Sequence, residues 1–219
     1  DHRAPLALVQ VAYRVGGRDE PPELSGISHF LEHLMFKGGR RLADGEYSAR
    51  ISRMGGVDNA ATGTDMTYYW AMVPSRHVAE VLSMEADRMD QLSYTADGFE
   101  KERHVIQQER RMRYEDNPQR LALEQFYALA NLGGGPAHLP IGWQAVIQQL
   151  GSEQVQAWHR RYYRPSEAVL VVIGDVNASQ VVKQAKRYFG HLDGEKFAAF
   201  HPDYECIGLG GFIHIPSIR

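Results

Sequence analysis

Apolar residues recur along the chain with the two periods that distinguish strands from helices. Residues 6–15, LALVQVAYRV, are apolar and rich in β-branched side chains, and two glycines follow them, which predicts a buried strand. Residues 57–62 and 64–73 flank Gly63 and predict a pair of strands joined by a turn. A further apolar run, AVLVVIGDV at 168–176, predicts another strand.

Between these strands the apolar positions follow helical spacing. Ser25 is a candidate cap for the first helix, and Gly38 and Gly39 would end it. The predicted helices lie at 25–37, 44–54, about 75–92, 97–115, 118–131, near 143–149, 152–163 and about 178–189. Strands and long helices mix without strict alternation, so we expect an α+β fold with a mostly antiparallel sheet flanked by several helices.

Composition narrows the possible functions. The chain has 219 residues, of which 43% are hydrophobic and 23% charged, as in an ordinary globular protein. Its net charge of -3 gives no reason to expect nucleic acid or an anionic membrane as a partner. No apolar run is long enough to span a membrane. Cys206 is the only cysteine, so a metal would have to be held by His, Asp or Glu.

The run SGISHFLEHLMFKGG carries the first sign of chemistry. Its apolar residues form one helical stripe, made of Ile27, Phe30, Leu31, Leu34 and Met35. His29 and His33 lie one turn apart on the other side, with Glu32 beside them and Phe36 close by. Two such imidazoles can point at one metal ion about 2 Å from each, and Glu32 could then deprotonate a water at that ion. The alternative is an ordinary solvated helix face.

A tetrahedral catalytic zinc needs a third protein ligand, and the helix predicted at 97–115 offers two candidates. Its core-facing stripe contains Phe99, Glu102, Ile106 and Glu109. Carboxylates on such a stripe are costly unless a cation pairs with them. Glu109 could instead pair with Arg113 at i+4 on the surface. Periodicity does not choose between Glu102 and Glu109.

Several motifs in order resemble one known family. HFLEHLMFKG together with ERHVIQQE resembles the pitrilysin family of zinc metallopeptidases, the inverzincins, whose H-x-x-E-H reverses the usual H-E-x-x-H. The stretches YRVGGRDEPPELSGISHFLEH, GGVDNAATGTDMTYYW, HLPIGW and RYYRPSEAVLVVIGDV extend the resemblance from about residue 5 to residue 190. The chain is therefore identified as resembling the zinc-binding half of a two-half metallopeptidase.

The resemblance implies a role for each candidate residue. The family's third ligand is a glutamate some 75 residues after the second histidine, and Glu109 follows His33 by 76 residues. One zinc ion per chain would thus bind His29, His33 and Glu109, with Glu32 as the catalytic base. Glu102 matches an acidic residue that supports the site.

The resemblance also implies a mode of substrate binding. DNAAT matches the family's exposed edge strand beside the zinc, which takes a peptide as an added strand. Main-chain bonds through Asn59, Ala60 and Ala61 would hold extended peptides with little demand on their sequence. The alternative is an ordinary hairpin strand with Asn59 in a turn.

Active members of this family pair two homologous halves around one chamber, and the second half commonly lends an arginine and a tyrosine to the substrate. We therefore expect a second half, in the same full-length chain or in a partner chain. Residues 1–195 would be the zinc-binding peptidase domain and 196–219 a linker or tail, whose sequence does not match the family pattern. The chain opens directly into a strand without an initiator methionine, as expected for a piece of something longer.

The leading hypothesis is a zinc endopeptidase that cuts peptides or small unfolded proteins. One alternative is a zinc- and peptide-binding subunit that cleaves only with its second half, and another is a non-catalytic scaffold. The complete set His29, Glu32, His33 and Glu109 argues against the scaffold. A zinc hydrolase acting on esters or deacylation substrates would not explain the edge strand. The sequence identifies neither the natural substrate nor the compartment.

Overall fold

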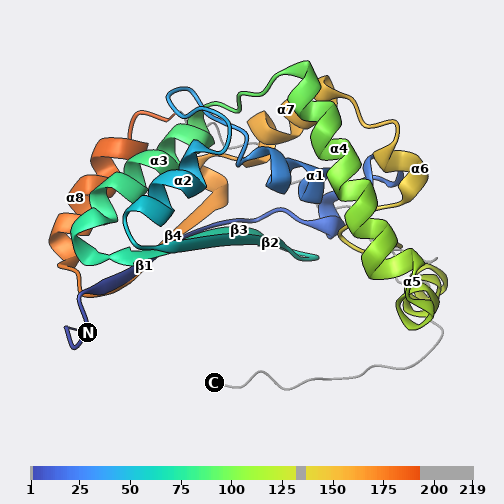
Figure 1. The fold of residues 1–219 in the computed structure, drawn as a ribbon, viewed down its shortest axis with the longest axis horizontal. Helices are drawn as coiled ribbons and strands as arrows, with labels where there is room; N and C mark the ends of the chain where they lie inside the picture. Colours follow the sequence, from blue (N-terminus) through green and yellow to red (C-terminus); the bar gives the residue numbers. More distant parts are fainter. Residues whose placement is uncertain (1, 132–136, 193–219) are drawn as a thin grey trace.

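The structure is a computed structural model that describes residues 2–131 and 137–192. A four-stranded antiparallel sheet with the order β2-β3-β1-β4 forms its base (Figure 1). The strands are β1 Leu6–Tyr13, β2 Val57–Thr62, β3 Thr67–Pro74 and β4 Ala168–Gly174. All four strands occur where the periodicity predicts them.

Helices follow the predicted order along the chain. They are α1 Ile27–Leu34, α2 Glu46–Arg53, α3 Val78–Asp90, α4 Ala96–Arg110, α5 Pro118–Ala130, α6 Gln144–Ile147, α7 Ser152–Tyr162 and α8 Ala178–Phe189. Short 3-10 turns occupy Gly17–Asp19, Pro22–Leu24, Ser75–His77 and Pro165–Glu167. The α+β fold is confirmed.

The first helix begins later than predicted, and Ser25 is not its cap. Gly26 precedes the helix with a φ of 89°, in the left-handed region that suits glycine. Glu20 takes the capping role from outside the helix, since its carboxylate accepts hydrogen bonds from the amides of Gly26 at 2.6 Å and Ser28 at 2.8 Å. The Ser25 hydroxyl instead accepts the Trp143 amide at 3.2 Å. Local sequence favoured serine, but a buried carboxylate from another segment replaces it.

Two other boundaries differ from the prediction. α1 ends at Leu34 rather than at Lys37. The helix predicted at 97–115 is α-helical only to Arg110 and continues as a π-helical turn, Arg111–Glu115. The proposed division at residue 195 and the tail 196–219 lie outside the described residues.

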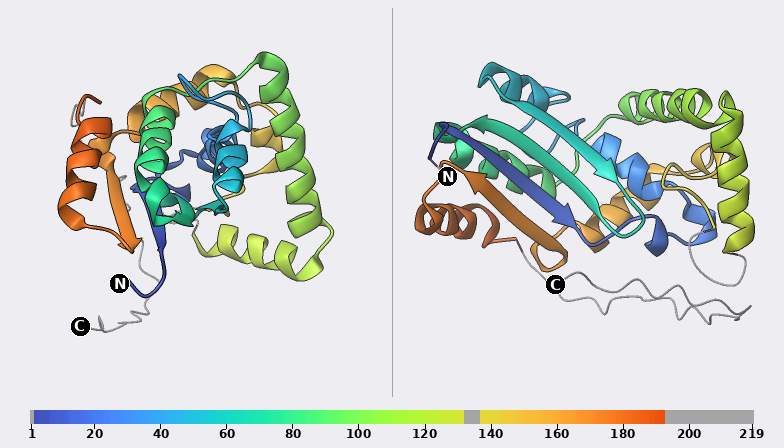
Figure 2. Two further views of the ribbon diagram at one scale, coloured as in Figure 1. Left: turned by 60° about the vertical axis from the view of Figure 1, so that its left-hand side comes forward. Right: turned by 90° about the horizontal axis from the view of Figure 1, so that it is seen from below.

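The helices gather on one face of the sheet, and Figure 2 shows the sheet's other face from below. The core lies between the layers, with β1 and β3 residues such as Val11 and Tyr69 packed against α1 residues such as Phe30 and Leu31. The opposite face carries exposed apolar side chains that share a face by the strand register: Val57, Tyr68, Met72, Val169 and Ile173. We call these five residues the open apolar face. Within the described ranges, no helix is long and apolar enough to cross a membrane.

Candidate metal centre

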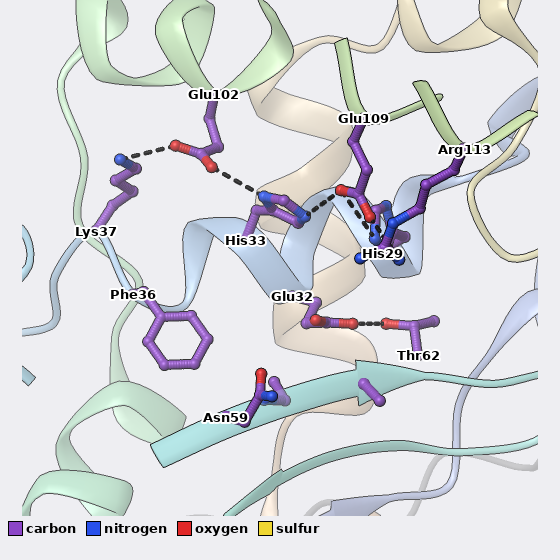
Figure 3. Close-up of a pocket in the computed structure, with 12 residues that line it drawn as sticks. His29, Glu32, His33, Phe36, Lys37, Asn59, Thr62, Glu102, Glu109 and Arg113 are labelled. Carbon is purple, nitrogen blue, oxygen red and sulfur yellow. Dashed lines mark hydrogen bonds and ion pairs between the residues drawn. The ribbon is translucent and has the colours of Figure 1, made fainter. Parts of the chain in front are cut away.

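Two helices and the edge strand bring the predicted site residues together (Figure 3). α1 packs against the core through its apolar stripe, which leaves His29, Glu32 and His33 on its other side. α4 lies against α1 and contributes Glu102 and Glu109. β2 passes on the opposite side of α1 from α4.

His29, His33 and Glu109 each offer one ligand atom, and these atoms all lie within 4.8 Å of one another. The Glu109 Oε2 atom is 3.3 Å from His33 Nε2 and 3.8 Å from His29 Nε2. Two tetrahedral ligand atoms about 2.0–2.1 Å from a zinc ion lie roughly 3.3–3.4 Å apart. The trio therefore fits one zinc ion after small side-chain adjustments, and its His/His/carboxylate composition is a donor set that zinc accepts.

Glu102 contacts Nδ1 of His33, the ring nitrogen that faces away from Glu109. Its Oε1 lies 2.9 Å from His33 Nδ1, while its Oε2 forms a 2.7 Å ion pair with Lys37 Nζ. Because the Glu102 carboxylate accepts a hydrogen bond from Nδ1–H, the neutral form of His33 would carry its free lone pair on Nε2, the nitrogen that faces Glu109. The structure thus places the two glutamates that periodicity left equivalent on opposite nitrogens of His33.

Burial and charge set the protonation of the histidines in the metal-free site. Burial, aided by the neighbouring His33, lowers the pKa of His29 to about 4, so His29 is neutral at pH 7. Burial also acts to lower the pKa of His33, but its bonds to Glu102 and Glu109 outweigh this and raise that pKa to about 9. Hydrogen bonding to His33 lowers the pKa of Glu109 below its usual value. The cluster therefore holds two carboxylates that attract a cation.

Glu32 stands apart from the trio and faces β2. The hydroxyl of Thr62 donates a hydrogen bond to its Oε2 atom. Burial raises the pKa of the Glu32 carboxyl above its ordinary value, although the Thr62 bond acts in the opposite direction. A carboxylate with a raised pKa is a stronger base, which is the property that proton transfer near neutral pH requires.

Glu109 combines the two pairings that the sequence offered as alternatives. Its Oε1 forms a 2.9 Å ion pair with Arg113 Nη1, at i+4, while its Oε2 faces the histidines. The surface ion pair thus does not compete with the inward contact, because each uses a different oxygen.

A cleft of about 500 Å³ runs between α1, α4 and β2. Its lining consists of His29, Glu32, His33, Phe36, Lys37, Asn59, Ala60, Ala61, Thr62, Glu102, Glu109 and Arg113. Sequence reasoning gave no role in the cleft to Lys37 or Thr62. The i+4 spacing of Lys37 from His33 was a usable signal, whereas the contact of Thr62 with Glu32 crosses 30 positions and has none.

Among the strands of the described residues, β2 lies at the edge of the sheet and pairs with β3 alone. The Ala60 amide donates to the side-chain oxygen of its neighbour Asn59 at 2.8 Å, so it is not engaged by β3. Asn59, Ala60 and Ala61 all line the cleft. The structure therefore places the free edge of β2 beside Glu32, with the Ala60 amide bonded to the Asn59 side chain rather than to a neighbouring strand.

Comparison with known proteins identifies the family to which the chain belongs. A family model described as "Insulinase (Peptidase family M16)" matches residues 1–135, and one described as "Peptidase M16 inactive domain" matches residues 149–213. The chain belongs to peptidase family M16, the insulinase family, which confirms the resemblance to pitrilysin-type metallopeptidases.

Individual relatives agree with this assignment. The chain is 35% identical to the zinc protease PqqE of Helicobacter pylori over 96% of its own length and 52% of that protein. It is 30% identical to a Bacillus subtilis protein named "Uncharacterized zinc protease YmxG", over 82% of this chain and 44% of that one. A crystal structure of a protease from Helicobacter pylori superposes with a TM-score of 0.87 at 33% identity, covering 93% of this chain and 49% of that one.

The chain thus spans about half the length of these relatives. Their names identify zinc as the metal of this group of proteases.

Proposed function

We propose that this chain is the zinc-holding half of a metalloendopeptidase, with one zinc ion bound by His29, His33 and Glu109. The observation that carries the proposal is the meeting of these three ligand atoms from α1 and α4 beside Glu32 and an unpaired strand edge. Membership in a peptidase family gives the reaction class, the hydrolysis of peptide bonds.

Each residue then has a distinct task. Zinc bound there would supply a Lewis acid that polarises a peptide carbonyl and makes a water molecule more acidic. Glu32 takes the proton from that water and delivers it to the leaving amine. Thr62 holds Oε2 of Glu32, which leaves Oε1 for the proton. Glu102, supported by Lys37, orients His33 so that its Nε2 faces the metal.

The edge of β2 supports an extended peptide as substrate. A peptide that adds to an exposed edge is held through main-chain hydrogen bonds, so its side chains contribute less to recognition. Asn59, Ala60 and Ala61 would provide this edge, and the small side chains at 60 and 61 allow a second backbone to approach. The substrates would be peptides or unfolded segments that can adopt an extended conformation.

A homologous second half, in the same full-length chain or in a partner chain, would complete the enzyme. The double length of the relatives supports this. So does the open apolar face, since contiguous exposed apolar surface on a sheet is typical of an interaction site. These same observations favour a second candidate function, in which this half binds zinc and peptide but cleaves only when its second half is present.

The test is cleavage of a quenched fluorescent peptide by the zinc-loaded protein, with zinc content measured in parallel. Glu32→Gln should retain zinc and lose cleavage, and Glu109→Gln should bind zinc more weakly. Equal loss of zinc in both variants would overturn the assignment of roles. Full zinc occupancy without cleavage by the unmodified chain would favour the second candidate, and a chain that binds no zinc would favour a scaffold.

A further inference from the structure

Arg110 directly follows Glu109 and is almost completely buried at the end of α4. Its side chain is 5% exposed, and its partner Glu124 on α5 is 1% exposed. The guanidinium donates two hydrogen bonds to the Glu124 carboxylate, at 2.8 and 2.9 Å, and a third to the backbone oxygen of Gly142 at 2.6 Å. One side chain therefore joins the end of α4 to α5 and to the segment before α6.

That segment is fixed in turn against the start of α1. A Cβ atom at Gly142 would lie 2.3 Å from the Ser25 oxygen and 2.5 Å from the Gly26 Cα, so only glycine permits this approach. The next amide, of Trp143, donates to the Ser25 hydroxyl at 3.2 Å. Ser25 and Gly26 lead directly into α1, which carries both histidines.

These contacts form a continuous connection between the two helices of the metal centre. It runs from the backbone beside Glu109, through Arg110 and Gly142, to the residues that start α1. Glu109 stands at the last α-helical turn of α4, immediately before the π-helical turn Arg111–Glu115. A helix end followed by irregular backbone needs an external contact to hold a side chain to within a fraction of an ångström.

We propose that Arg110 is a positioning residue, which holds Glu109 at ligand distance from His29 and His33 by fixing the end of α4 to Gly142. The proposal rests on the proposed zinc site. It assigns Arg110 a contribution to metal affinity that is separate from its contribution to stability.

The two contributions can be separated because Arg110 is one of a buried charged pair. Removing Arg110 alone would leave the Glu124 carboxylate buried without its main partner, so that variant could fail to fold. Replacing both residues by methionine removes both charges and fills similar space, a change that is often neutral for stability. It also removes the hydrogen bond to Gly142.

The experiment compares the unmodified protein with the double variant Arg110→Met/Glu124→Met. Zinc dissociation constants are measured by competition with a chromophoric chelator, and melting temperatures are measured on the metal-free proteins. We expect the double variant to melt within about 4 °C of the unmodified protein. Its zinc affinity should be roughly 10- to 100-fold lower, the range found when residues that orient metal ligands are changed.

Two further variants sharpen the result. Arg110→Lys keeps a cation for Glu124 but lacks the planar fork that reaches Gly142 as well, so we expect lower zinc affinity there too. Arg41→Met is the control, because Arg41 also pairs with a buried carboxylate, that of Asp87 at 2.8 Å, but its own side chain is 62% exposed and lies away from the cleft. It should leave zinc affinity unchanged.

The possible outcomes distinguish a failure of the proposed zinc site from a failure of the proposed positioning role of Arg110. If the unmodified protein binds no zinc, the proposed metal site itself is wrong. If it binds zinc and the double variant binds equally tightly, the metal site stands and Arg110 has only a structural role. If the double variant loses zinc affinity together with melting temperature, and Arg41→Met loses both in the same proportion, the positioning role is refuted.

Discussion

Replacing Glu102 tests whether the two glutamates of α4 have different roles. In Glu102→Ala, His33 Nδ1 loses its 2.9 Å acceptor, and the ion pair that Lys37 retains among the described residues is the one with Asp44, at 3.8 Å. The ring is then free to rotate, but all three proposed ligands remain. Loss of such an orienting carboxylate typically weakens metal binding about 10- to 100-fold, or about 1.4–2.7 kcal/mol.

Glu109→Ala is the comparison, since it removes a proposed ligand rather than its support. Its loss of zinc affinity should exceed the roughly 100-fold upper end expected for an orienting residue. Glu102→Gln should fall between Glu102→Ala and the unmodified protein, because an amide oxygen still accepts from Nδ1. The assay is titration against a chelator of known zinc affinity at constant pH. If Glu102→Ala loses zinc as completely as Glu109→Ala, or loses no affinity at all, the division of roles is wrong.

Three further changes probe the rest of the molecule. Burial lowers the pKa of His159 from 6.5 to about 4, so the unfolded chain takes up a proton first as the pH falls. The contribution of neutral His159 to the free energy of unfolding is complete above pH 6.5 and is lost toward pH 4, by up to about 3 kcal/mol. Urea unfolding measured across this range should show that the stability of His159→Gln depends less steeply on pH. Ala60→Pro removes one amide from the free edge of β2, a change that an edge strand tolerates. It should raise the KM for peptide cleavage about 2- to 12-fold, which corresponds to the loss of one hydrogen bond. An unchanged KM would argue against strand addition. Arg88→Met leaves the fully buried Glu85 without its 2.6 Å partner and should cost about 3–5 kcal/mol, whereas thermal unfolding of Glu85→Met/Arg88→Met should show most of that stability restored.

The sequence predicts well those features that depend on neighbours along the chain. Strand and helix periods locate every sheet strand and every helix of the described residues, because each element buries a regular stripe. The i, i+4 spacing of His29 and His33 places both rings on one helix face, and their ring centroids indeed lie 4.7 Å apart.

Features that depend on contacts between distant segments are not predictable in this way. The start of α1 is set by the carboxylate of Glu20, and the Glu32 carboxylate accepts a hydrogen bond from Thr62 on strand β2. Neither contact has a periodic signal. The end of α4 is similar, because Arg110 bonds to Glu124 and Gly142, which lie 14 and 32 positions further along the chain. From helix propensity alone, Arg110 would be predicted to be an ordinary helix residue without long-range contacts.

The spacing of Glu102 and Glu109 explains how one helix can supply both the proposed zinc ligand and the proposed support for His33. Seven residues make nearly two full turns, so Glu102 and Glu109 lie within about 20° on the same face and roughly 10.5 Å apart along the axis. The His33 ring lies between them and contacts one carboxylate through each nitrogen. This arrangement requires regular α-helix from 102 to 109, because one extra residue would rotate one glutamate by about 100° away from the ring. The π-helical turn, which widens the helix, begins only after Arg110. The π-helical turn therefore does not disturb the contacts of Glu102 and Glu109 with His33. Arg110, at the end of the regular α-helix, attaches α4 to Glu124 and Gly142.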